Sequence, residues 1–344
     1  MKQAQESKSK TQNIADRAAF WLTIIALVVG FVTLTAVMLI AAFTIWFERK
    51  WTGRMQNRPG PTERGYAGIL QIFADFFKLL QKEDLTPTAA DRRLFNAVPP
   101  IVVFIVLSSL AAVPYVPRGP AADASVGVLL ALAISSLMVF PVWTAGWSSN
   151  NKWALLGAMR AVAQSISYEI PLVLSALVPV ILAGSFRLTE IVDAQAGWHW
   201  FAFWPPGPGL VAFVLFYLST LAEANRIPFD IPEAESELVA GATTEYGGMK
   251  FGMFYLGEYV HTFVASSLAA LLFFGGWEGP GPDGLHWMLA KALVLTASVV
   301  HVRWTLVRYR SDQLLRLCWT YFVPVALVLV FAAGLWRILA GGVA

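Results

Sequence analysis

The sequence predicts an all-α, polytopic membrane protein with about eight spanning helices and one further amphipathic helix at the membrane surface. Of its 344 residues, 57% are hydrophobic and only 14% are charged, whereas a soluble domain carries roughly 25% charged residues. Apolar runs of about 20 residues or more, enough to cross a hydrocarbon layer of about 30 Å, recur along the chain. The uneven distribution of Lys and Arg among the loops predicts the orientation.

The apolar runs predict one integral membrane domain, preceded by an N-terminal tail at residues 1–17. The first run is too long for a cleaved signal peptide and ends in "FERK" rather than in a small-residue cleavage site. We expect the spanning helices at residues 18–47, 94–116, 125–147, 153–184, 208–224, 251–276, 285–306 and 317–339.

The basic residues concentrate in alternate loops. Loops 48–93, 148–160, 225–250 and 301–316 together hold 17 of the 25 Lys and Arg residues. Because loops rich in Lys and Arg stay in the cytoplasm, we expect these four loops to be cytoplasmic and both termini to face the outer side.

The basic loop 48–93 contains an amphipathic segment at residues 66–82. Its apolar residues cover one wide helical face, and Gln71, Asp75, Lys78 and Lys82 recur on the other. A segment this short with a charged stripe is expected to lie in the interface. An ordinary surface anchor would have the same pattern, but an ion pair between Asp75 and Lys78 could orient a polar group there.

The chain carries few residues that could hold a redox centre. Cys318 is the only cysteine, which excludes a disulfide framework and a cysteine-ligated iron–sulfur cluster within this chain. The four histidines are scattered and form no spaced metal motif. No glycine-rich nucleotide loop follows a predicted strand. If the protein takes part in electron transfer, a partner must carry the electrons.

Two acids fall inside predicted spans, where charge is costly. Glu169 lies in the fourth span, where Pro171 could kink the helix, and Glu258 lies in the sixth with His261 on the same face. Intramembrane acids usually face protein or water and mark an ion pathway. A structural ion pair would explain one such acid; two of them beside an acidic loop favour a proton or ion path.

The loop 225–250 and its flanks are strongly acidic. Pro228 and Pro232 predict turn or extended backbone, and Pro232 is suited to begin a short helix over "PEAESELVAG". Apolar residues alternate with the acids, so we expect the loop to fold into an acid-lined cavity, although a solvated loop would have the same charge. The acids are Glu223, Asp230, Glu233, Glu235, Glu237 and Glu245.

These segments together resemble a known family. The motifs on which the resemblance depends are "ERKWTGRMQNRPGP", "ADFFKLLQKED", "NKWALLGAMRAVAQSISYEIP", "LAEANRIPFDIPEAESELVAG", "TEYGGMKFGMFYLGEY", "FFGGW" and "RYRSDQL". They are similar to the H subunits of proton-pumping NADH-quinone oxidoreductase, which is respiratory complex I; the mitochondrial counterpart is subunit 1. The resemblance runs from about residue 20 to residue 335.

The resemblance implies a subunit at the heel of the membrane arm in a bacterial inner membrane. With two peripheral-arm subunits it would form a chamber for ubiquinone or menaquinone, and it would also contact small membrane-arm subunits and lipid. FMN and iron–sulfur clusters would lie only in partner subunits, with no covalent cofactor and no nucleic acid in this chain. The implied quinone-binding residues are Glu48, Arg49, Arg58, Asp75, Lys78, Arg226, Phe229 and Arg303.

The resemblance also implies a proton relay from the chamber into the membrane. Its residues would be Arg160, Glu169, Glu223, Asp230, Glu233, Glu235, Glu237, Glu245 and Glu258. Two alternatives stay open: a related subunit of a membrane-bound hydrogenase or formate hydrogenlyase, and an independent ion transporter. The complete "ERK…RPGP" and "ADFFK" motifs favour the quinone enzyme, and the paired interrupted helices of many transporters are not visible. A purely structural anchor is the least favoured hypothesis.

Overall fold

The computed structural model describes residues 21, 30, 34–117, 124–197, 199–204, 208–233 and 235–339. Within these residues the regular secondary structure is entirely helical. This confirms the predicted all-α membrane fold. Residues 34–55 form a continuous N-terminal helix, while most of the predicted first span before residue 34 lies outside the described residues.

Six described helical segments are long and apolar enough to cross a membrane, which matches six of the predicted spans. The predicted span 208–224 corresponds to a shorter apolar helix, α8, of 16 residues. The six long segments are Arg92–Ala112, Gly127–Ser148, Lys152–Ala183, Gly248–Phe273, Leu285–Thr305 and Ser311–Leu339.

Two of these segments are less regular than the sequence suggested. The third predicted span divides into α4 (Gly127–Ser136) and α5 (Val139–Ser148). The last span begins earlier than predicted, because α12 (Ser311–Leu317), a π-helical turn (Cys318–Phe322) and α13 (Val323–Leu339) follow one another directly. Such π turns occur mostly as single-turn insertions inside α-helices.

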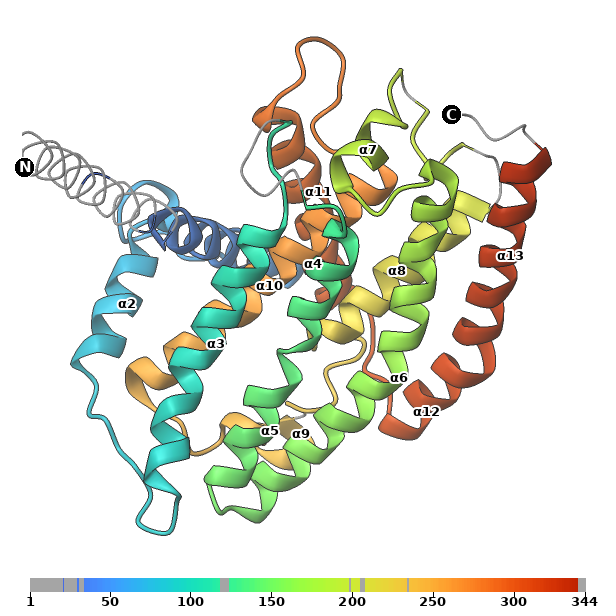
Figure 1. The fold of residues 1–344 in the computed structure, drawn as a ribbon. Coiled ribbons are helices and arrows are strands. Elements are labelled where there is room, and N and C mark those ends of the chain that lie inside the picture. The colour runs from blue at the N-terminus through green and yellow to red at the C-terminus, as the bar shows by residue number, and fades with distance from the viewer. Residues whose placement is uncertain are drawn as a thin grey trace, which may run out of the picture.

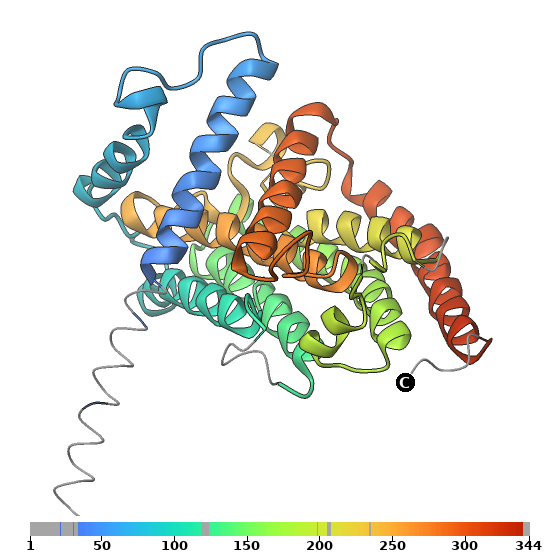
Figure 2. The same cartoon turned by 90° about the horizontal axis from the view of Figure 1, so that it is seen from above.

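The central helix of the molecule is α10 (Gly248–Phe273). It packs against α3 (Arg92–Ala112) and α11 (Leu285–Thr305), and its apolar stretch is almost wholly buried. A second set of helices packs around α6 (Lys152–Ala183): α5, α8 (Pro208–Glu223) and α13. The N-terminal helix and α2 lie at one edge of the molecule and α13 at the opposite edge (Figures 1 and 2).

The amphipathic segment folds as α2 (Gln71–Gln81), preceded by a short 3₁₀ turn, η1 (Tyr66–Gly68). The helix is therefore shorter than the predicted 66–82, because Ala67 in the left-handed region (φ 53°) interrupts the helical backbone. The predicted amphipathic character is confirmed: apolar side chains of α2, the partly exposed Phe73 and Phe77 among them, line a cavity toward α10, while Lys78 on the polar stripe is exposed and lies outside it.

The four basic loops meet on one side of the molecule. The backbone of Asp91 donates to Ser148 (N to O, 3.0 Å), and that of Tyr309 donates to Pro228 (2.9 Å). The Asn151 amide donates to the Glu245 carboxylate (2.6 Å) and so joins the second and third loops. On this side lie the short helix α9 (Glu235–Leu238) and the turn η2 (Gly241–Thr243), whereas α7 (Leu188–Asp193) lies on the other (Figure 1).

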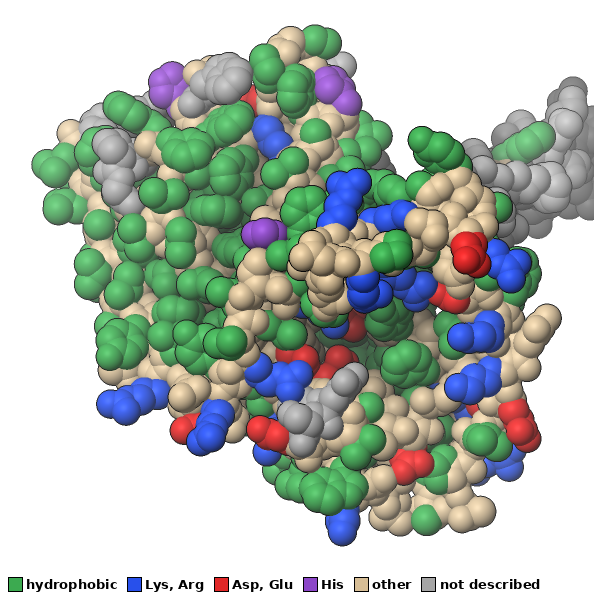
Figure 3. All heavy atoms as spheres, turned by 180° about the vertical axis from the view of Figure 1, so that it is seen from behind, with side chains coloured by type: hydrophobic (Ala, Val, Ile, Leu, Met, Phe, Trp, Pro, Cys, Tyr) green, Lys and Arg blue, Asp and Glu red, His purple; other side chains and the backbone are tan. Residues whose placement is uncertain are grey.

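The outer surface shows where lipid would contact the protein. Seen from behind, apolar side chains cover a broad face over α13, and charged side chains gather along one end and around a hollow (Figure 3). On α13 the exposed apolar side chains include Val328, Phe331 and Ile338. An apolar face of this extent is expected of a helix that faces hydrocarbon.

Candidate functional site

A buried arginine organises the charged interior. The Arg226 side chain is 3% exposed; its Nε lies 3.1 Å from Glu258 Oε1 on α10, and its Nη1 lies 3.7 Å from Glu48 Oε2 on the N-terminal helix. The guanidinium carbon also lies 4.4 Å from the centre of the Tyr259 ring. A buried charge needs such partners, because an uncompensated one is strongly destabilising.

The turn after α8 places Arg226 there. Asn225 adopts φ 49°, which ends the helix, and Gln164 of α6 donates its side-chain amide to the carbonyls of Ala222 (2.7 Å) and Phe229 (3.0 Å). Both ends of the turn are thus fixed to α6. The guanidinium is consequently directed inward, between α10 and the N-terminal helix.

The electrostatics of Arg226 favour its charged form. Burial lowers the pKa of the guanidinium, but the neighbouring Glu258, Tyr259 and Glu48 raise it by more, so that its pKa lies above the ordinary value. Opposite charges within a few ångströms stabilise the ionised state. Arg226 is therefore a fixed positive charge shared between two carboxylates.

Glu48 joins four segments of the chain. Its Oε1 accepts from Arg303 Nη1 of α11 (2.9 Å), and its Oε2 accepts from the Tyr259 hydroxyl (2.8 Å). The residue is 5% exposed. The guanidinium groups of Arg226 and Arg303 therefore both lie against the Glu48 carboxylate.

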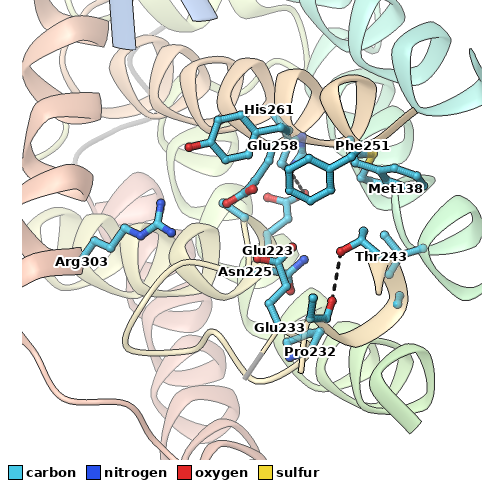
Figure 4. A pocket seen from close by; sticks show the side chains of 16 residues that line it. Met138, Glu223, Asn225, Pro232, Glu233, Thr243, Phe251, Glu258, His261 and Arg303 are labelled. Carbon is cyan, nitrogen blue, oxygen red and sulfur yellow. Dashed lines mark hydrogen bonds and ion pairs between the residues drawn. The ribbon is translucent and has the colours of Figure 1, made fainter. Parts of the chain in front are cut away.

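An acid-lined cavity of about 320 Å³ lies next to this cluster. The Glu223 and Glu258 carboxylates and the His261 ring face into it, and Arg303 points toward it from α11 (Figure 4). His261 Nε2 lies 3.6 Å from Glu223 Oε1, so the ring faces Glu223 and not Glu258, with which the sequence had grouped it. Glu233 lines the cavity from the loop before α9.

Glu169 lies deeper, on α6. It accepts a hydrogen bond from Ser165 Oγ (3.1 Å) and interacts electrostatically with Glu223. The helix continues through Pro171 without interruption from Lys152 to Ala183. Arg160 is not a partner of Glu169, because it pairs with Glu237 (Nη1 to Oε2, 2.5 Å).

The acidic loop is packed by specific contacts, as predicted. Asp230 pairs with Arg308 (Oδ2 to Nη2, 2.9 Å), the first residue of the "RYRSDQL" motif, to which the sequence analysis assigned no role. Phe229 is buried and contacts the ring of Tyr309. These contacts fix the turn before α9 to the segment after α11.

A second, apolar cavity of about 440 Å³ lies between the N-terminal helix, α2 and α10. Arg49 and Asp75 line it and form an ion pair with each other, so Asp75 pairs with Arg49 where the sequence suggested Lys78. Gln71 donates a further hydrogen bond to Asp75 (3.0 Å). Apart from this pair, the described lining is almost entirely apolar, including Ile72, Phe76 and Leu256.

Tyr255 lines both cavities. Its hydroxyl lies 2.9 Å from the Tyr259 hydroxyl, which in turn donates to Glu48. The apolar cavity, the acid-lined cavity and the Arg226 cluster are thereby in direct contact through one helix, α10.

The sequence matches the NADH dehydrogenase family over residues 26–334. The chain belongs to this family. It is 43% identical to the H subunit of the NADH-quinone oxidoreductase of Anaeromyxobacter dehalogenans, over 93% of this chain and 84% of the relative. It is 41% identical to the corresponding protein of Chlorobaculum tepidum (92% and 94% covered) and 42% identical to that of Dehalococcoides mccartyi (90% and 85%). The predicted family is confirmed.

The structure brings together some of the residues that the NADH dehydrogenase family resemblance implied. Glu48, Arg226, Glu258 and Arg303 form one cluster, with Glu223 and Glu233 on the adjoining cavity and Glu169 beyond Glu223. Arg58 and Lys78 are exposed and line neither described cavity. Glu245 and Glu237 serve as loop contacts, and the side chain of Glu235 lies outside the described part of the structure.

Several residues of the site carry no charge and were not predicted from the sequence. Tyr255 and Tyr259 lie four residues apart, a spacing that places both on one helical face together with Glu258. Gln164 and Asn151 act through hydrogen bonds that no motif indicates. Among the described residues, no group of three His, Cys, Asp or Glu side chains is arranged to hold a metal ion.

Proposed function

We propose that this chain, as the heel subunit of an NADH-quinone oxidoreductase, receives the quinone in its apolar cavity and uses the Arg226 cluster to transmit the reaction to the acid-lined cavity. The observation that carries the proposal is that Arg226 is shared by Glu48 and by Glu258, and that Glu258 lines the acid-lined cavity. In this arrangement, a change in the charge of Glu48 would alter the protonation of Glu258 through Arg226.

The apolar cavity has the chemistry that a quinone needs. Its lining suits an isoprenoid tail, and the Arg49–Asp75 pair supplies charged hydrogen-bonding groups for a polar head. Quinone reduction to quinol takes up two protons and two electrons; the electrons would arrive from FMN and iron–sulfur clusters in peripheral-arm subunits. The residues of this chain would bind and orient the quinone and supply the protons.

The coupling follows from Coulomb interactions in a low-dielectric interior. When Glu48 is ionised, it shares the positive charge of Arg226 with Glu258. If Glu48 were protonated, the positive charge of Arg226 would act on Glu258 alone of the two acids. The ionised form of Glu258 would then be favoured, and its proton affinity would fall. A proton would then pass to Glu223 or His261, which line the same cavity, and from Glu223 toward Glu169 on α6.

The orientation of the chain follows from its basic loops. The four loops that meet on one side hold most of the Lys and Arg residues, which favours the cytoplasmic side. We infer that this side contacts the peripheral-arm subunits in a bacterial inner membrane, while the apolar faces contact small membrane-arm subunits and lipid.

The experiment is a Glu258→Gln substitution in the assembled complex, reconstituted into proteoliposomes. Because Gln cannot ionise, we expect quinone reduction or proton translocation to fall at least about tenfold, as for a lost proton-transfer group. Glu63→Gln, an exposed acid in the first basic loop, is the matched control and should leave both rates unchanged. Full reduction and full pumping in Glu258→Gln with normal assembly would contradict the relay.

A further inference from the structure

Tyr255 occupies the boundary between the two cavities. It is half-buried on α10 and contributes to the lining of both. Its ring meets that of Tyr259 at 4.7 Å with an interplanar angle of 62°. The hydroxyl of Tyr255 is therefore held next to that of Tyr259, on a residue that lines both cavities.

The two tyrosines and Glu48 form a chain of hydrogen bonds with a defined direction. A phenol has one hydrogen to donate, and an ionised carboxylate only accepts. The Glu48 carboxylate forms ion pairs with Arg226 (3.7 Å) and Arg303 (2.9 Å), and as a carboxylate it only accepts. Tyr259 must then donate its hydrogen to Glu48 (2.8 Å), and its oxygen can only accept from Tyr255 (2.9 Å).

This direction determines what Tyr255 offers to a ligand. Its hydrogen is used toward Tyr259, so only oxygen lone pairs remain for the cavities. A quinone carbonyl is an acceptor and gains nothing from them, whereas a quinol hydroxyl can donate to them. The opposite direction requires a protonated Glu48, which can donate to Tyr259 and release the hydrogen of Tyr255.

We propose that Tyr255 discriminates quinol from quinone, and that the charge of Glu48 sets its preference through Tyr259. With Glu48 ionised, Tyr255 accepts from a quinol hydroxyl and retains the reduced form. With Glu48 protonated, Tyr255 donates to a quinone carbonyl. This inference rests on the proposed function, because it takes the apolar cavity as the quinone site, and it assigns Tyr255 as a specificity-determining residue.

The test compares quinol inhibition with quinone affinity in the assembled complex. NADH-driven reduction of decyl-ubiquinone is measured at increasing decyl-ubiquinol, which gives the KM of the quinone and the Ki of the quinol. In Tyr255→Phe we expect the Ki of the quinol to rise about three- to tenfold, the range of one neutral hydrogen bond, with the KM of the quinone unchanged. A purely structural role would move both constants together.

A second variant tests the direction of the chain. Tyr259→Phe keeps the ring beneath Arg226 but leaves Tyr255 without its acceptor, so Tyr255 can donate to a carbonyl. We expect the KM of the quinone to fall about three- to tenfold while the Ki of the quinol stays near the wild-type value. The control is Tyr217→Phe, which removes another half-buried hydroxyl, bonded to Ser298 at 2.8 Å, and should change neither constant.

The outcomes separate the two proposals. Equal changes of KM and Ki in Tyr255→Phe, or no change in either, would overturn the role of Tyr255 while the quinone function stands. An unchanged or higher KM in Tyr259→Phe would overturn the proposed direction. If the wild-type complex failed to reduce decyl-ubiquinone and its menaquinone analogue, the proposed function itself would fall, and the role of Tyr255 with it.

Discussion

Arg226 and Glu258 face each other inside the protein, with Arg226 Nε 3.1 Å from Glu258 Oε1. The turn after α8 supplies the arginine and α10 supplies the acid, so neither helix alone explains the pair. A side chain that is 3% exposed and carries a full charge depends on its partners. The pair is therefore a structural element of the chain, and the proposed coupling depends on it.

The first prediction concerns the loss of this charge. Arg226→Gln leaves Glu48 and Glu258 buried without their shared cation, and we expect a destabilisation of about 3–5 kcal/mol. Arg226→Lys retains the charge but not the planar fork that reaches two acids, and its effect should be intermediate. Thermal unfolding of the purified complex, with the yield of assembled complex, measures both.

The control for this prediction is Arg58→Gln. Arg58 is exposed and bonds Gln56 (2.7 Å), so its replacement should leave the stability within about 0.5 kcal/mol of the wild type. Equal stability of Arg226→Gln and Arg58→Gln would show that the buried pairs contribute little.

Sequence patterns predicted the membrane fold because span length and charge are local properties. The runs that became α3, α6, α10 and α11 are apolar over about 20 residues or more. The early start of the last span at Ser311 was not predictable from hydropathy, since α12 contains Asp312 and Arg316 and reads as a polar loop. At the start of this helix the backbone of Arg310 donates to the Gln313 side chain (3.1 Å), a capping contact that hydropathy does not register.

The candidate site was predictable in its acids but not in its pairings. Charge at costly positions selected Glu169 and Glu258 from the sequence alone, and the acidic loop with its flanks added Glu223. Their partners come from distant segments: Arg308 pairs with Asp230, and Arg49 pairs with Asp75. Only the packing of helices brings such residues together, so spacing along the chain misassigned Lys78 to Asp75 and His261 to Glu258.

The second prediction concerns the ion pair between Arg160 and Glu237. It fixes the acidic loop to α6, and both side chains are partly exposed (33% and 51%). Each charge reversal, Arg160→Glu or Glu237→Arg, places like charges together and should lower coupled proton translocation. The double reversal restores the attraction between the two side chains and should recover most of the proton translocation.

A double-mutant cycle measures this coupling. Because exposed ion pairs contribute about 0–1 kcal/mol, the four proteins should differ little in thermal stability. Translocation that is no better in the double reversal than in the single ones would show that Arg160 and Glu237 act independently.

The third prediction concerns the close approach of α6 to the turn η2. A Cβ atom on Gly157 would lie 2.7 Å from Gly241 Cα and 2.9 Å from Ala242 N, both backbone atoms. Gly157→Ala should therefore displace the turn at a cost of about 1–3 kcal/mol. Since Ala242 and Thr243 line the acid-lined cavity, quinone reduction should fall as well.

Gly334→Ala is the matched control for that substitution. It lies on α13, and a Cβ atom there would meet nothing within 4 Å. Alanine should leave quinone reduction unchanged and slightly favour the helix. Wild-type activity and stability in Gly157→Ala would mean that the backbone of η2 moves without consequence for the cavity.

The fourth prediction concerns Glu278, in the loop between α10 and α11 on the side opposite the basic loops. Burial, then the nearby Asp283 and Asp193, raise the pKa of its carboxyl from 4.5 to about 7, although Lys291 partly opposes this. A raised pKa means that folding favours the protonated acid, so Glu278 contributes stability at low pH that is lost as the pH rises through about 7.

Glu278→Gln should remove this contribution to the pH dependence. Gln stays neutral, so the decrease in unfolding temperature of the complex between pH 6 and pH 8 should be smaller in the variant than in the wild type. Glu190→Gln on α7, an exposed acid that pairs with Arg187 (3.4 Å), controls for loss of one acid on the same side. The same decrease in Glu278→Gln and the wild type would show that Glu278 is ionised in the folded protein throughout this range, and that Lys291 outweighs its burial.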